Sequence, residues 1–348
     1  MVVRIGINGF GRIGRMCLRA ALQNKNIKVV AINSTSDAQS SAHLLKYDSI
    51  HGKLNNVIEA TKDEIIIDGQ AIKIISDRDP ANLPWGKLGV DIVIESTGKF
   101  NSGKDCEIHL KNGAKKVIIT APAKDSIPTI VMGVNESIYN PATHHVVSNA
   151  SCTTNCLAPV VKVIHDNFGI VTGLMSTVHA FTTDQRSLDN SHKDPRRARS
   201  CVQSIVPTST GAAKAIGLVI PELKGKLNGV SVRVPVPNVS LVDLVVDLEQ
   251  DITAEKINAA LRNAAEGSMR GIIEYCDTPL VSIDFLGNSH SAIIDAPSTL
   301  VVGERTAKIL AWYDNEWGYS CRVLDLAAHI GKTLSTTQIK QSEIKAAG

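Results

Sequence analysis

The chain opens with the residues Val2-Val3-Arg4-Ile5-Gly6-Ile7-Asn8-Gly9-Phe10-Gly11-Arg12-Ile13-Gly14, which predict the fold of the N-terminal region. The apolar run before Gly9 is typical of a short buried strand. Arg15–Leu22 then has the pattern of an amphipathic helix, and Val29–Asn33 of a second strand. In this context Gly9 makes a tight turn, Gly11 lets a pyrophosphate approach the backbone, and Gly14 lets helix and strand pack closely. The stretch therefore predicts a dinucleotide-binding unit.

The residue expected to hold the adenosine ribose indicates which dinucleotide is used. An acidic residue about 20 positions beyond the last glycine holds the ribose 2′-hydroxyl of NAD. Ser34 occupies this place, followed by Thr35 and Ser36, and the nearest carboxylate is that of Asp37. Hydroxyl groups tolerate a 2′-phosphate and can donate hydrogen bonds to it, whereas a carboxylate repels it. The sequence favours NADP(H); the alternative is that Asp37 or another group holds the ribose of NAD.

A second stretch, Ser151-Cys152-Thr153-Thr154-Asn155-Cys156, contains a candidate nucleophile. Ser, Thr and Asn are good helix caps, and the apolar run from Leu157 predicts a buried helix that begins near Cys152. A helix N-terminus and a nearby imidazole, here that of His179, would lower the pKa of the thiol below about 8.5. The alternative is that Cys152 is a small buried residue and that His179, in an alternating strand pattern, is structural.

The composition is that of an ordinary globular protein with room for two domains. The 348 residues are 43% apolar and 20% charged, with a net charge of +3. This charge is too small to indicate a nucleic-acid or membrane-surface partner, and no apolar run reaches the length of a membrane span. The early strand predicts that no signal peptide is present, and seven cysteines in a large chain suit a reducing cytoplasm. Cys152 and Cys156 make a poor zinc site, so no metal is expected.

The order of the apolar runs predicts an α/β fold with two domains. We expect a Rossmann-type, doubly wound dinucleotide-binding domain at residues 1–150 and a catalytic α+β domain with a mixed or antiparallel sheet at 151–317. A C-terminal helix at 318–340 is expected to pack back on the first domain. In the first domain we predict further strands at Asp91–Glu95 and Lys116–Thr120 and a hairpin formed by Glu64–Ile67 and Ala71–Ser76.

The second domain is predicted from longer, alternating strands. These strands are Gly173–Phe181, Leu227–Pro235, Ser240–Asp247, Ser291–Asp295 and Thr306–Tyr313, with a helix at Thr253–Ala265 on one face of the sheet. Residues 182–206 have little periodicity and many charges. A loop of this length is usually functional or packed against a partner subunit.

Six blocks of the sequence resemble phosphorylating glyceraldehyde-3-phosphate dehydrogenases, and the resemblance covers nearly the whole chain, from about Val3 to Ile330. The most specific block is SNASCTTNCL at Ser148–Leu157. The others are NGFGRIGR (Asn8–Arg15), HKDPRRAR (His192–Arg199), PTSTGAAKA (Pro207–Ala215), RVPVPNVS (Arg233–Ser240) and WYDNEWGY (Trp312–Tyr319). Ser34 and Ser191 stand where many members have Asp and Pro, so in this respect the chain looks like the NADP-using, gluconeogenic or photosynthetic branch.

The resemblance implies an enzyme that interconverts glyceraldehyde 3-phosphate, phosphate and NAD(P) with 1,3-bisphosphoglycerate and NAD(P)H. Cys152 would form a thioester, and His179 would be the general base. The resemblance also implies a cytoplasmic homotetramer, with the loop at 182–206 packed between subunits. It assigns to the cofactor Gly9, Gly11, Arg12, Ile13, Gly14, Ser34, Arg78, Thr97, Thr120, Ser191 and Asn315. It assigns to the substrate and phosphate Ser151, Thr153, Thr182, Arg197, Thr210, Gly211 and Arg233.

Three other functions are compatible with parts of the sequence. Erythrose-4-phosphate dehydrogenase has the same fold and cysteine chemistry, although the run Ser209–Lys214 favours the three-carbon substrate. A non-catalytic dinucleotide-binding module has no need of the Cys152 and His179 pair. A cysteine hydrolase or acyltransferase has no need of the glycine motif.

Overall fold

The computed structural model describes residues 2–346, with side chains described as far as residue 334, and the chain divides into two compact units. The first unit contains the described residues up to Ile130, the segment Glu136–Ala150, and the described residues from Ser320 onward. The second unit contains Val131–Asn135 and Ser151–Tyr319. Among the described residues, no helix has the length and hydrophobicity needed to cross a membrane.

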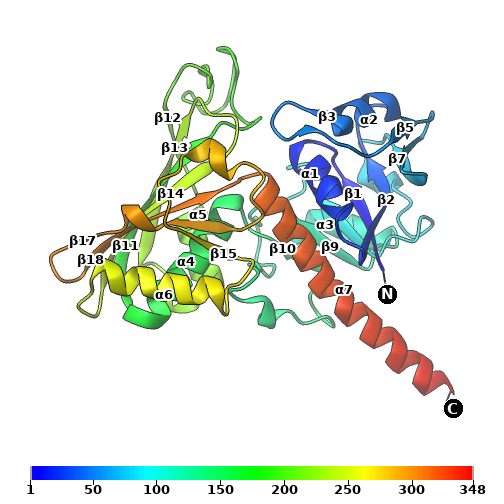
Figure 1. Ribbon diagram of the computed structural model, residues 1–348. Coiled ribbons are helices and arrows are strands. Elements are labelled where there is room, and N and C mark those ends of the chain that lie inside the picture. The colour runs from blue at the N-terminus through cyan, green and yellow to red at the C-terminus, as the bar shows by residue number, and fades with distance from the viewer. Residues whose placement is uncertain (1, 347–348) are drawn as a thin grey trace. The chain divides into compact units, whose positions relative to one another are not determined.

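The first unit is built on an eight-stranded sheet (Figure 1). In order across the sheet, its strands are β10 (Val146–Ser148), β9 (Lys116–Ile119), β8 (Ile92–Glu95), β1 (Val3–Asn8), β2 (Ile27–Asn33), β7 (Gln70–Ile75), β6 (Glu64–Ile67) and β5 (Ile58–Ala60). The first six are parallel, and β6 and β5 continue the sheet in antiparallel fashion. The chain order reverses between β1 and β8, and ligands bind at such a switch point in doubly wound sheets.

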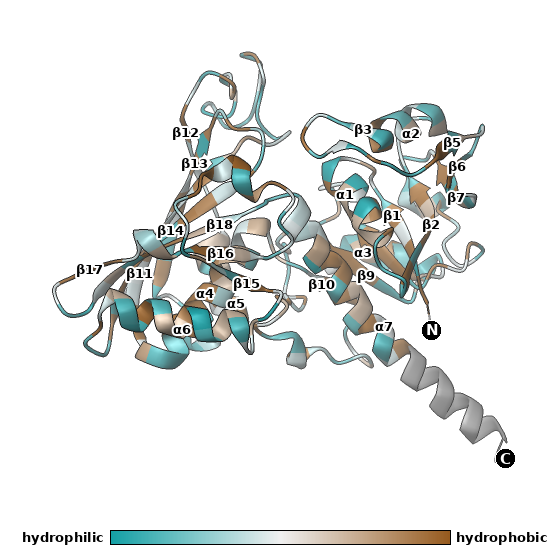
Figure 2. Ribbon diagram, in the orientation of Figure 1, coloured by the Kyte–Doolittle hydropathy of each residue, from teal (hydrophilic) through white to brown (hydrophobic). Residues whose placement is uncertain are grey.

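Helices pack along this parallel sheet because its strands are apolar on both faces. Every residue of β8 and β9 is buried, as a two-sided cover requires, and the strands are largely brown, hence hydrophobic, in Figure 2. The helices are α1 (Arg12–Ala21), α2 (Ala38–Lys46), α3 (Gly103–Lys111) and, mostly within this unit, α7 (Trp317–Ala346). Helix α7 approaches β1 closely, since a Cβ added to Gly331 would stand 2.2 Å from Val3 Cγ2.

The second unit contains a mixed sheet covered by helices on one face. Its strands, in order, are β12 (Val206–Ser209), β13 (Leu227–Val234), β11 (Ile170–Ala180), β14 (Ser240–Leu248), β18 (Thr306–Tyr313), β16 (Ala292–Asp295) and β15 (Ile273–Cys276), and β17 (Leu300–Val302) also pairs with β18. The helices are α4 (Cys152–Phe168), α5 (Ala212–Val219) and α6 (Ala254–Glu266). Helix α4 packs on β14 and β18, α5 packs on β13, and α6 packs on α4.

The predicted fold class, an α/β protein with a Rossmann-type sheet, is confirmed. The hairpin is also confirmed: β6 and β7 are antiparallel, and Asp68 and Gly69 at its turn both have positive φ, 48° and 79°. The long alternating strands and helix α6 lie within a few residues of their predicted bounds. The sequence pattern did not predict β3 (Tyr47–Asp48), β4 (Gly52–Lys53), β5, β10, β12, β15 and β17, because runs of two to four residues are too short to show a clear period.

Candidate active site

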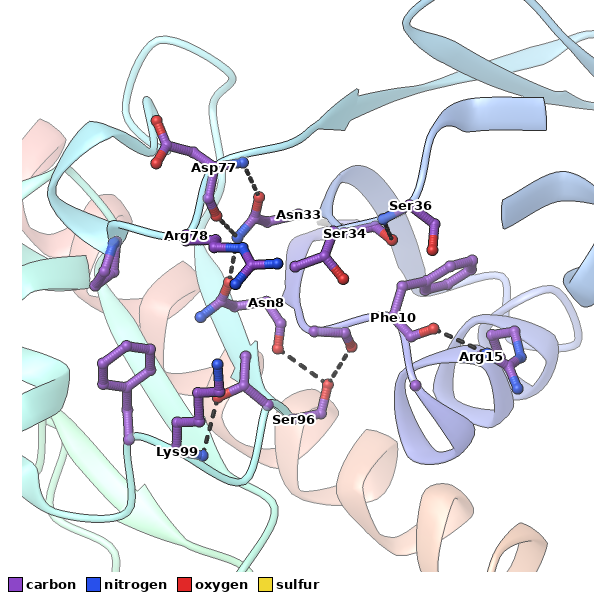
Figure 3. A pocket seen from close by; sticks show the side chains of 16 residues that line it. Asn8, Phe10, Arg15, Asn33, Ser34, Ser36, Asp77, Arg78, Ser96 and Lys99 are labelled. Carbon is purple, nitrogen blue, oxygen red and sulfur yellow. Dashed lines mark hydrogen bonds between the residues drawn. The ribbon is translucent and has the colours of Figure 1, made fainter. Parts of the chain in front are cut away.

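A cavity of about 410 Å³ in the first unit lies at the carboxyl ends of β1, β2 and β8 (Figure 3). The cofactor residues inferred from the sequence that line it are Gly9, Gly11, Ser34, Arg78 and Thr97. Sequence reasoning did not assign the other eleven lining residues to the cofactor, namely Asn8, Phe10, Arg15, Asn33, Thr35, Ser36, Asp77, Pro80, Ser96, Lys99 and Phe100. A strand-end position could have indicated Asn8 and Asn33, since each is the last residue of its strand.

The glycine motif fits a bound dinucleotide. Gly9 has φ 95°, and a Cβ there would lie 2.7 Å from Thr97 N. A Cβ on Gly14 would lie 2.2 Å from Gly9 O, so the helix and the turn pack with no room for a side chain. A Cβ on Gly11 would meet no protein atom within 4 Å, which leaves open space beside the backbone at the start of α1. A tight turn at Gly9, open backbone at Gly11 and close packing at Gly14 are the three features that pyrophosphate binding requires of such a motif.

Six of the residues inferred for the cofactor do not line the cavity: Arg12, Ile13, Gly14 and Thr120 of the first unit, and Ser191 and Asn315 of the second. The first three form the first turn of α1, where backbone N–H groups favour an anion. The Arg12 guanidinium pairs with Asp48. Thr120 Oγ1 donates to Glu95 O at 3.0 Å. The side chains of Arg12 and Thr120 thus bind other protein groups, Asp48 and Glu95 O, and do not line the cavity.

In the second unit, Cys152 is the first residue of helix α4. Ser151 is the N-cap, and its Oγ accepts a hydrogen bond from Thr154 N at 3.1 Å. Cys152 Sγ lies 3.5 Å from His179 Nε2. The predicted helix start is confirmed, and the fold brings the two residues singled out from the sequence into contact.

His179 lies on the buried face of β11 and has two neighbours at its other ring nitrogen. Nδ1 is 2.7 Å from Ala180 O and 2.8 Å from an Arg233 Nη. A neutral imidazole cannot donate and accept at the same nitrogen, so these contacts correspond to alternative tautomers. When Nδ1–H donates to Ala180 O, Nε2 has a lone pair directed toward the thiol. Burial, and then the Arg233 charge, lower the pKa of His179 to about 3.

The surroundings of Cys152 oppose the expected lowering of its pKa. Burial raises the pKa of this thiol, although the Arg233 charge and hydrogen bonds involving Thr153 lower it. The sequence-based expectation was therefore wrong for the thiol taken alone, because a helix start can be buried as well as electropositive. The pKa of Cys156 is raised well above its ordinary value by burial. Cys156 is thus an unreactive core residue.

Two residues that position His179 were missed from the sequence. The Tyr313 ring packs edge-on against the imidazole, with centroids 5.9 Å apart, and its hydroxyl hydrogen-bonds to Thr153 and Thr177. Ser240 Oγ accepts from Ala180 N at 3.1 Å and donates to Asn315 Oδ1 at 2.8 Å. The alternating pattern of their strands predicts that Tyr313 and Ser240 are buried. It does not predict that they lie close to His179.

The residues assigned to anions lie at strand ends, a helix start and the long loop. Gly211 is the N-cap of α5, and Thr210 Oγ1 accepts from Ala212 N at 3.2 Å. The Arg197 guanidinium pairs with Asp184 and Asp194. Thr182 lies two residues beyond the end of β11, at the start of the loop. Ser191 is exposed within the loop, and its N–H donates to Asn190 Oδ1 at 2.7 Å. Of the two arginines, Arg233 thus contacts His179, whereas Arg197 forms ion pairs with carboxylates of its own loop.

Comparison with known proteins assigns this pair of units to one family. The family model "Glyceraldehyde 3-phosphate dehydrogenase, NAD binding domain" matches residues 3–103, and the "C-terminal domain" model of the same name matches residues 151–315. A glyceraldehyde-3-phosphate dehydrogenase of Geobacillus stearothermophilus is 58% identical over 330 residues, which cover 95% of this chain and 98% of that protein. The chain belongs to the glyceraldehyde-3-phosphate dehydrogenase family.

Other relatives give the same result. Glyceraldehyde-3-phosphate dehydrogenase 2 of Bacillus subtilis strain 168 is 57% identical over 95% of this chain and 97% of its own length. The Streptomyces coelicolor glyceraldehyde-3-phosphate dehydrogenase is 55% identical over 96% of this chain and all of its own length. The NAD-binding match includes all residues that line the cavity, and the C-terminal match includes Cys152 and His179. A nicotinamide dinucleotide is therefore the cofactor class of this family member.

The glycine geometry predicts that one alanine substitution lowers the stability of the protein and that another lowers its affinity for the cofactor. Gly14→Ala should destabilise the cofactor-free protein by about 1–3 kcal/mol, because the new Cβ meets a backbone oxygen. Gly11→Ala should leave that stability unchanged and weaken cofactor binding, because its Cβ enters the open space. Urea unfolding and cofactor titration separate the two effects. Equal behaviour of both variants in both measurements would contradict this reading.

The buried state of His179 predicts a specific pH dependence of stability. In the unfolded chain this histidine takes up a proton near its ordinary pKa of 6.5, but in the folded chain only near pH 3. The unfolded state binds the extra proton between these values, so stability is retained above pH 6.5 and falls by up to about 1.4 kcal/mol per unit as the pH decreases.

His179→Asn should remove this contribution, and unfolding in urea at pH 7, 6 and 5 measures it. The exposed His43 serves as the control, since His43→Asn should keep the wild-type slope. An unchanged slope in His179→Asn would show that the imidazole titrates equally in both states.

Proposed function

We propose that this chain oxidises glyceraldehyde 3-phosphate in the presence of phosphate, reversibly, to 1,3-bisphosphoglycerate, through a thioester on Cys152. The observation that supports this most directly is the 3.5 Å contact between Cys152 Sγ and His179 Nε2. A thiol beside a base is the arrangement needed for a covalent intermediate. Family membership supplies the substrate class, and the contact supplies the chemical groups.

The first half of the reaction forms a carbon–sulfur bond and then removes two electrons. Sγ attacks the aldehyde carbon, and the thiol proton passes by way of His179 to the aldehyde oxygen, which gives a thiohemiacetal. His179 Nε2 then takes the hydroxyl proton as the carbon loses its hydride, which leaves a thioester. The bound nicotinamide cofactor supplies the acceptor for this hydride. The tautomer with Nδ1–H donating to Ala180 O holds Nε2 ready for both transfers.

The second half of the reaction breaks the carbon–sulfur bond. An oxygen of inorganic phosphate attacks the thioester carbon, the thiolate leaves, and the imidazolium of His179 returns its proton to sulfur. Arg233 is suited to a phosphate oxygen, because its Nε has no hydrogen-bond partner among the described residues. The residues assigned to anions by the resemblance, Ser151, Thr153, Thr182, Arg197, Thr210 and Gly211, are proposed to complete the two phosphate sites. Asn315 is proposed to hold the cofactor carboxamide.

The nucleophile assignment predicts different effects for two neighbouring cysteines. Cys152→Ser should bind cofactor normally and lose several orders of magnitude in turnover, since a serine hydroxyl is hardly ionised at neutral pH. Cys156→Ser should cost far less, because Cys156 is buried in the core, where its Sγ hydrogen-bonds to Ala311 O at 3.8 Å.

The assay follows NAD(P)H formation from glyceraldehyde 3-phosphate with and without phosphate, with erythrose 4-phosphate as the comparison substrate. Mass spectrometry of the phosphate-free reaction should detect the acyl group on Cys152. An active Cys152→Ser enzyme, or NAD(P)H formation that never depends on phosphate, would refute the proposal.

We also propose that the cofactor is NADP(H) in preference to NAD(H). Ser34 lines the cavity, while Asp37 does not: its carboxylate caps α2, where it accepts from Ser40 N at 2.7 Å and Ser40 Oγ at 3.1 Å. Arg78 and Lys99 line the cavity as well. Near Ser34 the lining therefore offers a hydroxyl and the positive charge of Arg78 (Figure 3), which suit a 2′-phosphate. The carboxylate of Asp77 also belongs to the lining, and it accepts hydrogen bonds from Asp79 N and Asn82 Nδ2. Ser191 is proposed to add a second hydroxyl from the long loop.

A carboxylate at position 34 should reverse this cofactor preference. Ser34→Asp introduces repulsion worth about 2–4 kcal/mol in relative preference, whereas Ser34→Ala removes only a hydroxyl and should shift the preference much less. The measurement is kcat/KM for both cofactors in the wild type and the two variants. A wild type that prefers NAD by a hundredfold would show that another group holds the ribose.

The uncovered face of the second unit's sheet supports the proposed homotetramer. Leu174 and Val245 are directly opposite each other on β11 and β14, and Val178 and Val230 are also exposed. Leu174 is 68% exposed, which is unusual for a leucine in the middle of a sheet. The resemblance to the family also implies that the loop at 182–206 packs between subunits. A second copy of the chain would cover these apolar groups.

Light scattering at micromolar concentration should report a tetramer, and Leu174→Lys should yield smaller species because it places a charge on the apolar face. The exposed Leu44→Lys, in the first unit, serves as the control for added charge. A stable, active wild-type monomer would overturn the proposed assembly.

A further inference from the structure

A buried carboxylate, Glu95, lies beside the cofactor cavity and takes no part in the proposed chemistry. It is the last residue of β8, directly opposite Asn8 at the end of β1, and is 1% exposed. Its Oε2 accepts from Asn8 Nδ2 at 2.5 Å. Its Oε1 accepts from Thr97 N at 2.8 Å and from the Thr97 hydroxyl. Asn8 and Thr97 both line the cavity, so Glu95 connects two of its walls.

A second buried residue completes the donors around this carboxylate. His109 of α3 places Nε2 3.2 Å from Glu95 Oε2, and both side chains are inaccessible to solvent. Trp85 Nε1 donates to His109 Nδ1 at 3.0 Å. An indole N–H can only donate, so Nδ1 must accept and the ring proton must be on Nε2. His109 is therefore a neutral donor to Glu95, held in that tautomer by Trp85.

The hydrogen bonds continue from Asn8 across the sheet. Asn33 Nδ2 donates to Asn8 Oδ1 at 2.8 Å and to Asp77 O at 2.9 Å, and Asp77 N donates to Asn33 Oδ1 at 3.1 Å (Figure 3). One connected set of bonds thus runs from Trp85 to the segment that carries Arg78. It joins the carboxyl ends of β8, β1 and β2 and the segment that follows β7, which form the walls of the cavity.

We propose that Glu95 and His109 are positioning residues for the cofactor: they hold Thr97, Asn8 and Asn33 in the geometry that binds the dinucleotide without lining the cavity themselves. A carboxylate in this place must accept from every neighbour, because all four groups around it donate. Loss of one donor leaves a buried charge undersatisfied, and the segment that carries Thr97 is free to shift. This inference rests on the cofactor cavity and does not require the aldehyde chemistry.

The test compares two replacements of His109 that differ in one property. Glutamine can donate to Glu95 through its amide N–H and accept from Trp85 through its amide oxygen, whereas phenylalanine fills the space and can do neither. His109→Phe should raise the dissociation constants of NAD and NADP roughly tenfold or more, and His109→Gln should recover most of the loss. Glu107→Gln is the matched control, since Glu107 lies on the same helix with its side chain 58% exposed.

Two further measurements separate positioning from general damage. Hydrogen exchange of the cofactor-free protein should accelerate at residues 95–99 in His109→Phe, while the rate of Cys152 alkylation in the second unit should not change. Glu95→Gln, which puts an amide among four donors, should weaken both cofactors in the same way. Wild-type cofactor binding by His109→Phe, or equal losses in the Phe and Gln variants, would overturn the proposal. Failure of both His109→Phe and Glu95→Gln to fold would also overturn it, since the network would then serve the fold alone.

Discussion

The burial of a thiol and an imidazole in contact with each other is the constraint on which the proposed chemistry depends. Burial favours the neutral form of each group, since it raises the pKa of Cys152 and lowers that of His179. Transfer of a proton from Sγ to Nε2 separates charge within the pair but adds no net charge to it. Arg233 stabilises the thiolate and disfavours the imidazolium. Its Nε, for which the described residues offer no hydrogen-bond partner, can meet an anion. An anion on Arg233 would therefore make His179 a stronger base.

The fully or partly buried charged side chains of the two proposed sites differ in how completely they are hydrogen-bonded. In the first unit Glu95 is surrounded by donors, and its charge is spread over hydrogen bonds to Asn8, Thr97 and His109. This gives a rigid wall for a ligand that binds mostly through its shape and its phosphates. In the second unit Arg233 Nε has no hydrogen-bond partner in the described part of the chain, and Arg233 Nη lies beside His179 of the proposed reactive pair. A hydrogen-bonded wall suits the proposed cofactor site, and a buried donor that can meet a ligand suits the proposed reaction site.

The sequence predicted those features that depend on local pattern. Gly9, Gly11 and Gly14 predicted the first strand–helix–strand unit because each task excludes a side chain, and Ser151 predicted the start of α4 because a cap is local. It did not predict the Tyr313 and Ser240 contacts around His179, or the His109–Glu95 bond, because these join side chains of different helices and strands, whose packing is a tertiary property. The thiol pKa was predicted in the wrong direction because burial is a tertiary property.

The pH dependence of Cys152 alkylation, compared between the wild type and His179→Asn, tests the central claim most directly. If the imidazole accepts the thiol proton, the wild type should react at lower pH than the variant, in which burial keeps the thiol protonated. Alkylation is read by mass spectrometry at Cys152 alone, so the other cysteines do not contribute. Superimposable profiles would contradict the account, because His179 would then be a neighbour of the thiol that takes no part in its ionisation.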